Sequence, residues 1–213
     1  MHCIETVETD FGTWKTFRDV KQNILTEQGW EVYDKYRQLT ADDIIVDIGA
    51  HTGLFTIKAA KIAKKVISIE PHPDNFALLK ENIELNNLKN VMPLNMALCS
   101  FNGLAKLFLH PWASGSHSLI SEHDGKFVEI QARRLDDLLQ EILTGNEQVT
   151  FIKSDAEGAT PALLAGADNL LQKSKDLFMA METNYAGEQT TVKNFLIAKG
   201  FEIKTQSYGN EAY

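Results

Sequence analysis

The sequence contains few cysteines and no long apolar run. Its two cysteines, Cys3 and Cys99, show no metal-ligand spacing, so we expect a reducing compartment and no metal site. The first eight residues have neither a basic segment nor an apolar core, which argues against a secretory signal. No later segment holds enough consecutive apolar residues to span a bilayer. These absences predict a cytoplasmic protein that does not insert into a membrane.

Basic side chains are also in deficit. Lysine and arginine together number 21 against 29 aspartates and glutamates, which gives a formal net charge of −8. Binding to nucleic acid needs a dense surface of lysine and arginine that faces the phosphates. The charge therefore argues against a nucleic-acid partner.

From residue 43 onward the sequence alternates apolar strands with amphipathic helices. At 213 residues the chain is expected to form one compact α/β domain with additions. Strands that alternate with helices favour a doubly wound, mainly parallel sheet with right-handed crossovers. The strands of this sheet are expected at 44–49, 66–70, 91–98, 149–155, 177–182 and 201–204.

Two segments depart from this simple winding. Residues 103–109 and 127–132 alternate between apolar and polar side chains, as half-buried strands do. They flank a polar loop at 114–118, so we expect an inserted pair of strands.

The first 42 residues are predicted to be an N-terminal helical extension to a cofactor-binding domain over 43–213. Within 11–38, Trp14, Phe17, Val20 and Ile24 recur at helical spacing. We expect these aromatic residues to pack against the sheet, and a lid over the binding pocket is the alternative.

The turn after the first expected strand of the sheet indicates a nucleoside cofactor. Gly49 and Gly53 follow a buried strand and are expected to let the backbone approach the ligand. A dinucleotide turn reads G-x-G-x-x-G, but Ala50 and His51 follow Gly49, so the middle glycine is missing. Asp47 would repel a pyrophosphate, whereas it suits an ammonium and a sulfonium. The turn therefore favours S-adenosylmethionine (SAM) over NAD.

Glu70 completes this prediction. It ends the second expected strand, where a carboxylate can accept hydrogen bonds from both ribose hydroxyls.

Three blocks of the sequence resemble the FkbM family of SAM-dependent methyltransferases, within the class I Rossmann-like methyltransferases. Residues 46–53 are similar to its V-D-x-G-A-x-x-G, and residues 68–73 to its A-x-E-P-x-P. Residues 151–159 are similar to its I-K-I-D-V-E-G-A-E, which is the most specific block. The likeness covers about residues 43–185, and Thr160 departs from the glutamate usual at that position.

This resemblance implies a Rossmann-like fold and O-methylation, often of a hydroxyl on a small molecule, polyketide or sugar. It implies that the glycine turn passes the methionine part of SAM and that Glu70 holds the ribose. Pro71, His72 and Ala97 would border the adenine. The expected cofactor-binding residues are Asp47, Gly49, His51, Gly53, Glu70, Pro71, His72, Ala97 and Asp155.

Methyl transfer to an alcohol also needs a group that takes the hydroxyl proton. Asp155 ends the fourth core strand beside the point where the strand order reverses, so it is the first candidate, as base or substrate orienter. Glu157 follows and could do the same. Either carboxylate could instead only neutralise Lys153, which would otherwise be a charge in an apolar strand. His117, in the 114–118 loop, is a third candidate, although an exposed loop histidine without a catalytic role is the alternative.

Asp155 and Glu182, at neighbouring strand ends, could together hold Mg²⁺, although paired carboxylates arise often by chance.

The leading interpretation is therefore a metal-free SAM-dependent O-methyltransferase that acts on a small molecule or sugar. A protein methyltransferase and a noncatalytic SAM-binding protein are the alternatives. An NAD-dependent reductase is disfavoured, because the chain lacks the middle turn glycine and a Tyr-x-x-x-Lys pair. The sequence determines neither the acceptor nor the oligomeric state.

Overall fold

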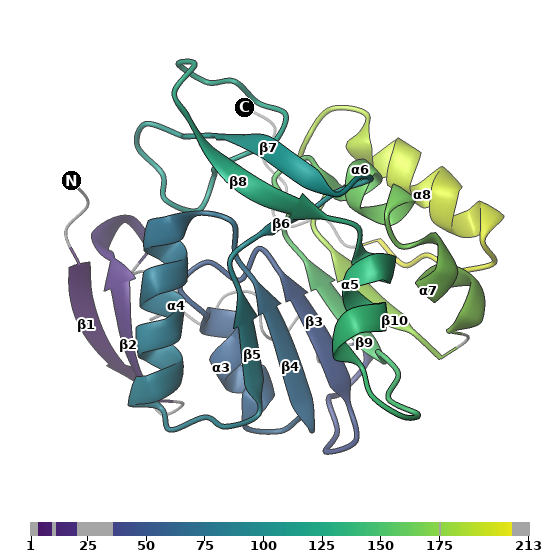
Figure 1. The fold of residues 1–213 in the computed structure, drawn as a ribbon, viewed down its shortest axis with the longest axis horizontal. Coiled ribbons are helices and arrows are strands. Elements are labelled where there is room, and N and C mark those ends of the chain that lie inside the picture. The colour runs from purple at the N-terminus through teal and green to yellow at the C-terminus, as the bar shows by residue number, and fades with distance from the viewer. Residues whose placement is uncertain (1–3, 10–11, 21–35, 175, 206–213) are drawn as a thin grey trace.

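A five-stranded parallel sheet forms the centre of the molecule (Figure 1). The computed structural model describes residues 4–9, 12–20, 36–174 and 176–205. Every neighbouring pair of strands in this sheet is parallel. The fold is thus the α/β, mainly parallel fold that the sequence predicts. In spatial order the strands are β10 (Phe178–Met181), β9 (Phe151–Ser154), β3 (Ile44–Ile48), β4 (Lys65–Ile69) and β5 (Val91–Leu94).

The strand order reverses beside β3. The chain runs outward from β3 through β4 to β5, then returns to place β9 on the other side of β3. Crossovers diverge at such a point, which leaves a crevice at the carboxyl ends of the strands.

Helices cover both faces of this sheet because consecutive strand residues point to opposite sides. In β3, Ile44, Val46 and Ile48 belong to one apolar cluster, which also contains leucines of α5 to α8. Ile45 faces the other side, where it packs in a cluster with Phe55 of α3. The helices are α3 (Leu54–Ala60), α4 (Pro73–Leu85), α5 (Leu135–Ile142), α6 (Thr160–Ala165), α7 (Asp168–Lys173) and α8 (Glu188–Ala198).

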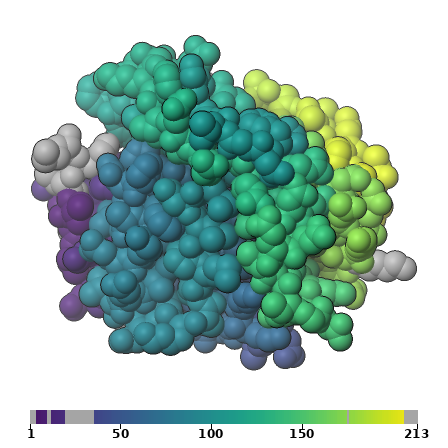
Figure 2. Space-filling view, viewed as in Figure 1, coloured from purple at the N-terminus to yellow at the C-terminus, as the bar shows by residue number. Residues whose placement is uncertain are grey.

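A second, smaller sheet stands above the first. It consists of β6 (Ala97–Leu98), β8 (Phe127–Arg133) and β7 (Gly103–Phe108), in that spatial order, and β7 and β8 form the predicted inserted pair. The strand expected over 91–98 is therefore divided, with β5 in the main sheet and β6 in this one. Figure 2 shows the inserted sheet and its connecting loop as a lobe on the main body.

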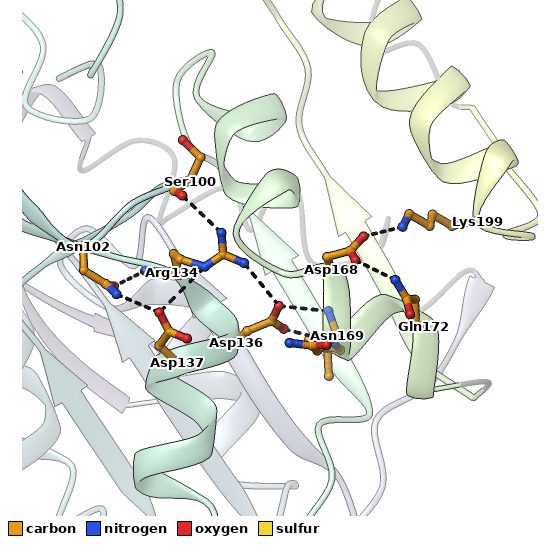
Figure 3. A network of polar contacts seen from close by, with 10 residues as sticks. Ser100, Asn102, Arg134, Asp136, Asp137, Asp168, Asn169, Gln172 and Lys199 are labelled. Carbon is orange, nitrogen blue, oxygen red and sulfur yellow. Dashed lines mark hydrogen bonds and ion pairs between the residues drawn. The ribbon is translucent and has the colours of Figure 1, made fainter.

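A polar network ties this lobe to the helices (Figure 3). Arg134 lies 3.7 Å from a carboxylate oxygen of Asp136 and donates to the carbonyl of Ser100. Asp136 accepts hydrogen bonds from the backbone N–H groups of Asn169 and Leu170, in the first turn of α7. The start of α5 is thereby fixed against α7.

The N-terminal prediction of helix over 11–38 is wrong at 12–17. Strands β1 (Ile4–Thr9) and β2 (Gly12–Phe17) form an antiparallel hairpin, followed by the short 3-10 helix η1 (Arg18–Val20). Trp14 and Thr16 are both fully buried, a spacing of two that fits a strand. Residues 21–35 lie outside the described part of the chain, so the remaining helix prediction and the lid are untested.

The final strand expected at 201–204 is also wrong. After α8 these residues have no regular secondary structure. Phe201 and Ile203 pack against the main apolar cluster without pairing to a strand. Their alternation therefore reflects burial alone. Among the described helices, none combines the length and apolar character that crossing a membrane requires.

Candidate active site

A cleft of about 1150 Å³ opens at the carboxyl ends of the parallel strands. Its walls come from the segments that follow β3, β4, β9 and β10, together with β6 and residues of the 114–119 loop. The crevice at the strand reversal is therefore a real cavity, large enough for a nucleoside cofactor beside a second molecule.

The glycine turn forms one wall, but its glycines serve a purpose that differs from the predicted one. Gly49 lines the cleft with φ +72°, and a Cβ there would lie 1.9 Å from the backbone oxygen of Asp155. Gly53, with φ +96°, lies outside the cleft lining, and its Cβ would meet Leu79 at 2.7 Å. The protein's own atoms, rather than a ligand, occupy the space that each Cβ would need.

Asp47 lies beneath this turn, outside the cleft lining. Its side chain is fully buried, accepts a 2.5 Å hydrogen bond from Thr56 and lies 3.4 Å from the ammonium nitrogen of Lys153. Lys153 also donates to the backbone oxygen of Gly49 at 3.0 Å. Asp47 therefore balances the buried lysine charge and supports the turn from below, a task that the sequence argument had offered to Asp155 or Glu157.

Glu70 follows β4 and lines the cleft at 4% exposure. One carboxylate oxygen accepts the His51 N–H at 2.8 Å, and the other accepts the His72 N–H at 2.9 Å. Burial raises the pKa of Glu70 to about 7, although these hydrogen bonds lower it in part. Glu70, the residue expected to bind the ribose, is thus held in a fixed orientation at the cleft, with a pKa near neutral pH.

The Ser114 loop closes over this side of the cleft. Ser114 lies 3.1 Å from the His51 ring through its hydroxyl, which also donates to Asp19 at 3.0 Å. Its carbonyl accepts a 3.0 Å hydrogen bond from Asn75, a helix α4 residue that also donates to Glu70. Burial lowers the pKa of His51 to about 4, so this imidazole is neutral at pH 7. Asn75 and Ser114 are site residues that the sequence argument missed, since no motif distinguishes them.

Of the residues expected around the adenine, two line the cleft and His72 lies outside its lining. Pro71 and Ala97 line the cleft, and the ring of His72 packs 4.2 Å from that of His117 between centroids. His117 also lines the cleft, and its Nδ1 accepts the His110 N–H at 3.0 Å. A neutral ring that accepts at Nδ1 carries its proton on Nε2. This arrangement argues against the predicted role of His117 as a base.

Three carboxylates line the cleft after β9 and β10, on the other side of β3 from Glu70. Asp155, Glu157 and Glu182 all line it. Glu157 has φ +46°, which is unusual for a residue with a side chain. Its backbone oxygen accepts a 2.7 Å hydrogen bond from Ser118, and its carboxylate accepts one of 3.2 Å from Tyr185. Two side chains thus hold Glu157 in a strained conformation.

Two of these carboxyl groups, Glu157 and Asp155, have pKa values raised well above their ordinary range. Burial, followed by the nearby Asp155 charge, raises the pKa of Glu157 to about 7. Burial also raises the pKa of Asp155 to about 6, against the attraction of Lys153. Perturbed carboxyl groups inside a cleft are typical of acid–base sites. Within the described ranges, no group of three or more histidine, cysteine, aspartate or glutamate side chains is arranged to hold a metal ion.

The cofactor end offers the polar groups that a nucleoside needs. Glu70 is a buried carboxylate whose Oε2 accepts, among the described residues, one hydrogen bond, from the His51 N–H. Buried acceptors without donors are costly, and a ribose supplies hydroxyl donors. The residues present therefore fit the adenosyl part of SAM.

Comparison with solved structures identifies the fold. The fold is similar to the crystal structure of methyltransferase FkbM from Methylobacillus flagellatus KT, with TM-score 0.55 and 18% identity, over 76% of this chain and 38% of that one. It is also similar to a precorrin 8w decarboxylase from Methanobacterium thermoautotrophicum, with TM-score 0.53 and 13% identity, over 92% of this chain and 78% of that one. These likenesses, together with the sheet order and cleft, define a Rossmann-like methyltransferase fold.

Sequence comparison then gives the family. A family model described as the methyltransferase FkbM domain matches residues 47–202. The chain is 25% identical over 186 residues to "Methyltransferase 1" of Beauveria bassiana, which covers 78% of this chain and 74% of that protein. Since the family model matches well over half of the sequence, the chain belongs to the FkbM methyltransferase family.

Proposed function

We propose that this protein is a SAM-dependent methyltransferase that methylates a hydroxyl group of a small molecule. One observation carries the proposal, namely that a single cleft is lined by Glu70, which follows β4, and by the carboxylates Asp155 and Glu157, which follow β9 on the other side of β3. A nucleoside site and an acid–base site in one cavity suit transfer of a group from a cofactor to an acceptor.

Glu70 and the glycine turn would hold the cofactor, and Pro71 and Ala97 would border its base. When bound, SAM supplies an electrophilic methyl group on a sulfonium. The residues of the chain align the acceptor with that methyl group and exclude water, which accounts for much of the rate of such a displacement.

Glu157 is the proposed general base. An alcohol becomes a better nucleophile as its proton leaves, and a carboxyl group that titrates near pH 7 is well matched to receive that proton. Asp155, next to the glycine turn, would orient the acceptor hydroxyl. Its raised pKa allows it to donate or accept a hydrogen bond near neutral pH.

Calorimetric titration with SAM, S-adenosylhomocysteine and NAD⁺ tests the cofactor. We expect micromolar binding of both adenosyl ligands, loss of that binding in Glu70→Ala, and no binding of NAD⁺. Glu84→Ala, in the exposed part of α4, is the matched control and should bind as the wild type does. Binding of NAD⁺ in place of both adenosyl ligands would overturn the proposal.

A transfer assay with methyl-labelled SAM and a panel of small hydroxylated compounds tests the reaction. Glu157→Gln should lose at least about a hundredfold in rate with the acceptor found, because a general base contributes roughly 10²–10⁴. It should keep the wild-type affinity for S-adenosylhomocysteine, since the carboxylate lies at the acceptor end. Transfer to amines or to protein alone would contradict the hydroxyl acceptor.

A further inference from the structure

The backbone of Glu157 is fixed from the side of the inserted lobe. Ser118, in the loop between β7 and β8, is 1% exposed, and its hydroxyl accepts the N–H groups of Ile120 and Ser121 at 3.1 and 3.2 Å. The single proton of that hydroxyl is donated to the backbone oxygen of Glu157 at 2.7 Å. These bonds hold the turn at Glu157 in its left-handed conformation, with φ +46°.

The carboxylate of Glu157 is fixed from the other side by Tyr185, which lies between β10 and α8. The Tyr185 ring packs against Gly158, because a Cβ on that glycine would lie 3.0 Å from a ring carbon. The Tyr185 N–H donates to the buried Glu188 carboxylate at 3.4 Å. The ring and backbone of Tyr185 are therefore held by contacts other than its hydroxyl, which donates to Oε2 of Glu157 at 3.2 Å.

This hydrogen bond opposes the negative charges around Glu157. Burial, followed by the charges of Asp155, Glu182 and Glu188, raises the pKa of Glu157 to about 7, while the Tyr185 hydroxyl lowers it. Within the described part of the chain, no other side chain donates to this carboxylate. A donor to the ionised form favours ionisation. The Tyr185 hydroxyl thus keeps Glu157 able to ionise at neutral pH, which a base requires.

We propose that Tyr185 is the positioning residue of the base, and that its hydroxyl holds Oε2 of Glu157 while Oε1 receives the proton of the acceptor. Glu157 lines the cleft, and Oε2 is already engaged. In the step, the O–H bond of the acceptor breaks, its proton bonds to Oε1 and its electron pair stays on the acceptor oxygen. This inference rests on the proposed function, because it takes Glu157 as the general base.

The first readout is the titration of Glu157 in the protein without cofactor. Nuclear magnetic resonance follows isotope-labelled glutamate carboxyl carbons across pH, and Glu157→Gln identifies the signal by its loss. Tyr185→Phe keeps the packed ring and removes only the donor. It should raise the pKa of Glu157 from about 7 to roughly 8. Circular dichroism monitors the fold of each variant.

The second readout is kcat against pH, with both substrates saturating. If the pKa of the base rises from about 7 to roughly 8, Tyr185→Phe should be about fivefold slower than wild type at pH 7 and within about twofold of it at pH 9. A tyrosine hydroxyl that only supports the fold would lower kcat by one factor at every pH. Thr191→Val, which removes an exposed hydroxyl from α8, is the control and should match the wild type in both readouts.

The outcomes separate this inference from the proposed function. If Tyr185→Phe leaves the pKa of Glu157 unchanged, or lowers kcat equally at every pH, the role of Tyr185 is overturned while the methyltransferase proposal stands. If the wild type transfers no methyl group to any hydroxyl, the proposed function fails. The positioning role then fails with it, even where the titration shows the expected rise.

Discussion

Gly49 has no side chain, and this allows the turn after β3 to pack against the backbone that follows β9. A Cβ there would lie 1.9 Å from the Asp155 backbone oxygen, and φ +72° is unfavourable for a side chain in any case. Gly49→Ala should lower the free energy of unfolding by about 2–4 kcal/mol, because overpacking and backbone strain add. Gly187 has φ +79° with no atom near its Cβ position, so Gly187→Ala should cost only the strain, about 1 kcal/mol. Denaturation by urea measures both, and equal losses would contradict the steric explanation.

The pKa of Glu70 predicts how cofactor affinity depends on pH. Its pKa is raised to about 7, and the ionised form is the better acceptor for ribose hydroxyls. The affinity for S-adenosylhomocysteine should therefore rise as pH increases from 6 to 8, by roughly tenfold for a single group with that pKa. Glu157 also titrates near pH 7 but lies at the acceptor end, so Glu157→Gln should keep the full slope. Calorimetry across this pH range measures the affinity, and a wild-type affinity that does not change with pH would contradict the role of Glu70 in binding the ribose.

At the scale of elements, the amide of Asn82 joins the N-terminal hairpin to α4. Asn82 is fully buried, accepts from the Lys15 N–H at 2.7 Å, and donates to the carbonyls of Lys15 and Thr52 at 2.8 Å each. Asn82→Ala leaves these backbone groups unsatisfied and should cost about 3 kcal/mol of stability. Asn86, which bonds Thr13 at the partly exposed rim, is the control, and Asn86→Ala should cost about 1 kcal/mol. Urea denaturation separates the two cases, and a loss for Asn82→Ala no larger than the control's would show that the hairpin is held by Trp14 packing instead.

The helices and strands that the sequence predicts correctly are those in which the spacing of apolar residues matches the faces that are buried in the structure. Strands β3, β4 and β9 place apolar side chains on both faces, because helices cover both sides of the sheet, and the helices between them carry clear apolar faces. The hairpin was missed because Trp14 and Phe17 are spaced as in a helix, although the α4 amides at Asn82 and Asn86 bond an extended backbone. These contacts join residues 67 and 73 positions apart and leave no local signature in the sequence.

The residues of the site likewise include some that the sequence could identify and some whose roles it could not. Glu70 and Asp155 could be found because the topology places the ends of parallel strands at one edge. The roles of Asp47 and Asn75 could not, since they depend on which atoms the surrounding chain has already bonded. The charge of Asp47 suggested a cofactor-binding residue, but its carboxylate instead pairs with the ammonium group of Lys153 on the neighbouring strand.

At the scale of the whole molecule, the cleft draws its walls from parts that are distant in sequence. The main sheet supplies Glu70, the inserted lobe supplies Ser114 and His117, and Asp19 after the hairpin holds Ser114 in place. No unfolded or partly folded chain brings these groups together. A ligand of the cleft should therefore stabilise the complete fold rather than a part of it.

This argument predicts a thermal shift of definite size. S-adenosylhomocysteine at about 100 times its Kd should add roughly 2.7 kcal/mol to the stability of the folded state. For a chain of this length that energy corresponds to a rise in Tm of about 5–10 °C, measurable by calorimetric scanning in one transition. Glu70→Ala should show no rise under the same conditions, while Glu84→Ala should match the wild type. A rise confined to one of two separate transitions would mean that the hairpin or the lobe unfolds independently of the cofactor end. The contacts of Asp19 with Ser114 would then not couple these parts to the site.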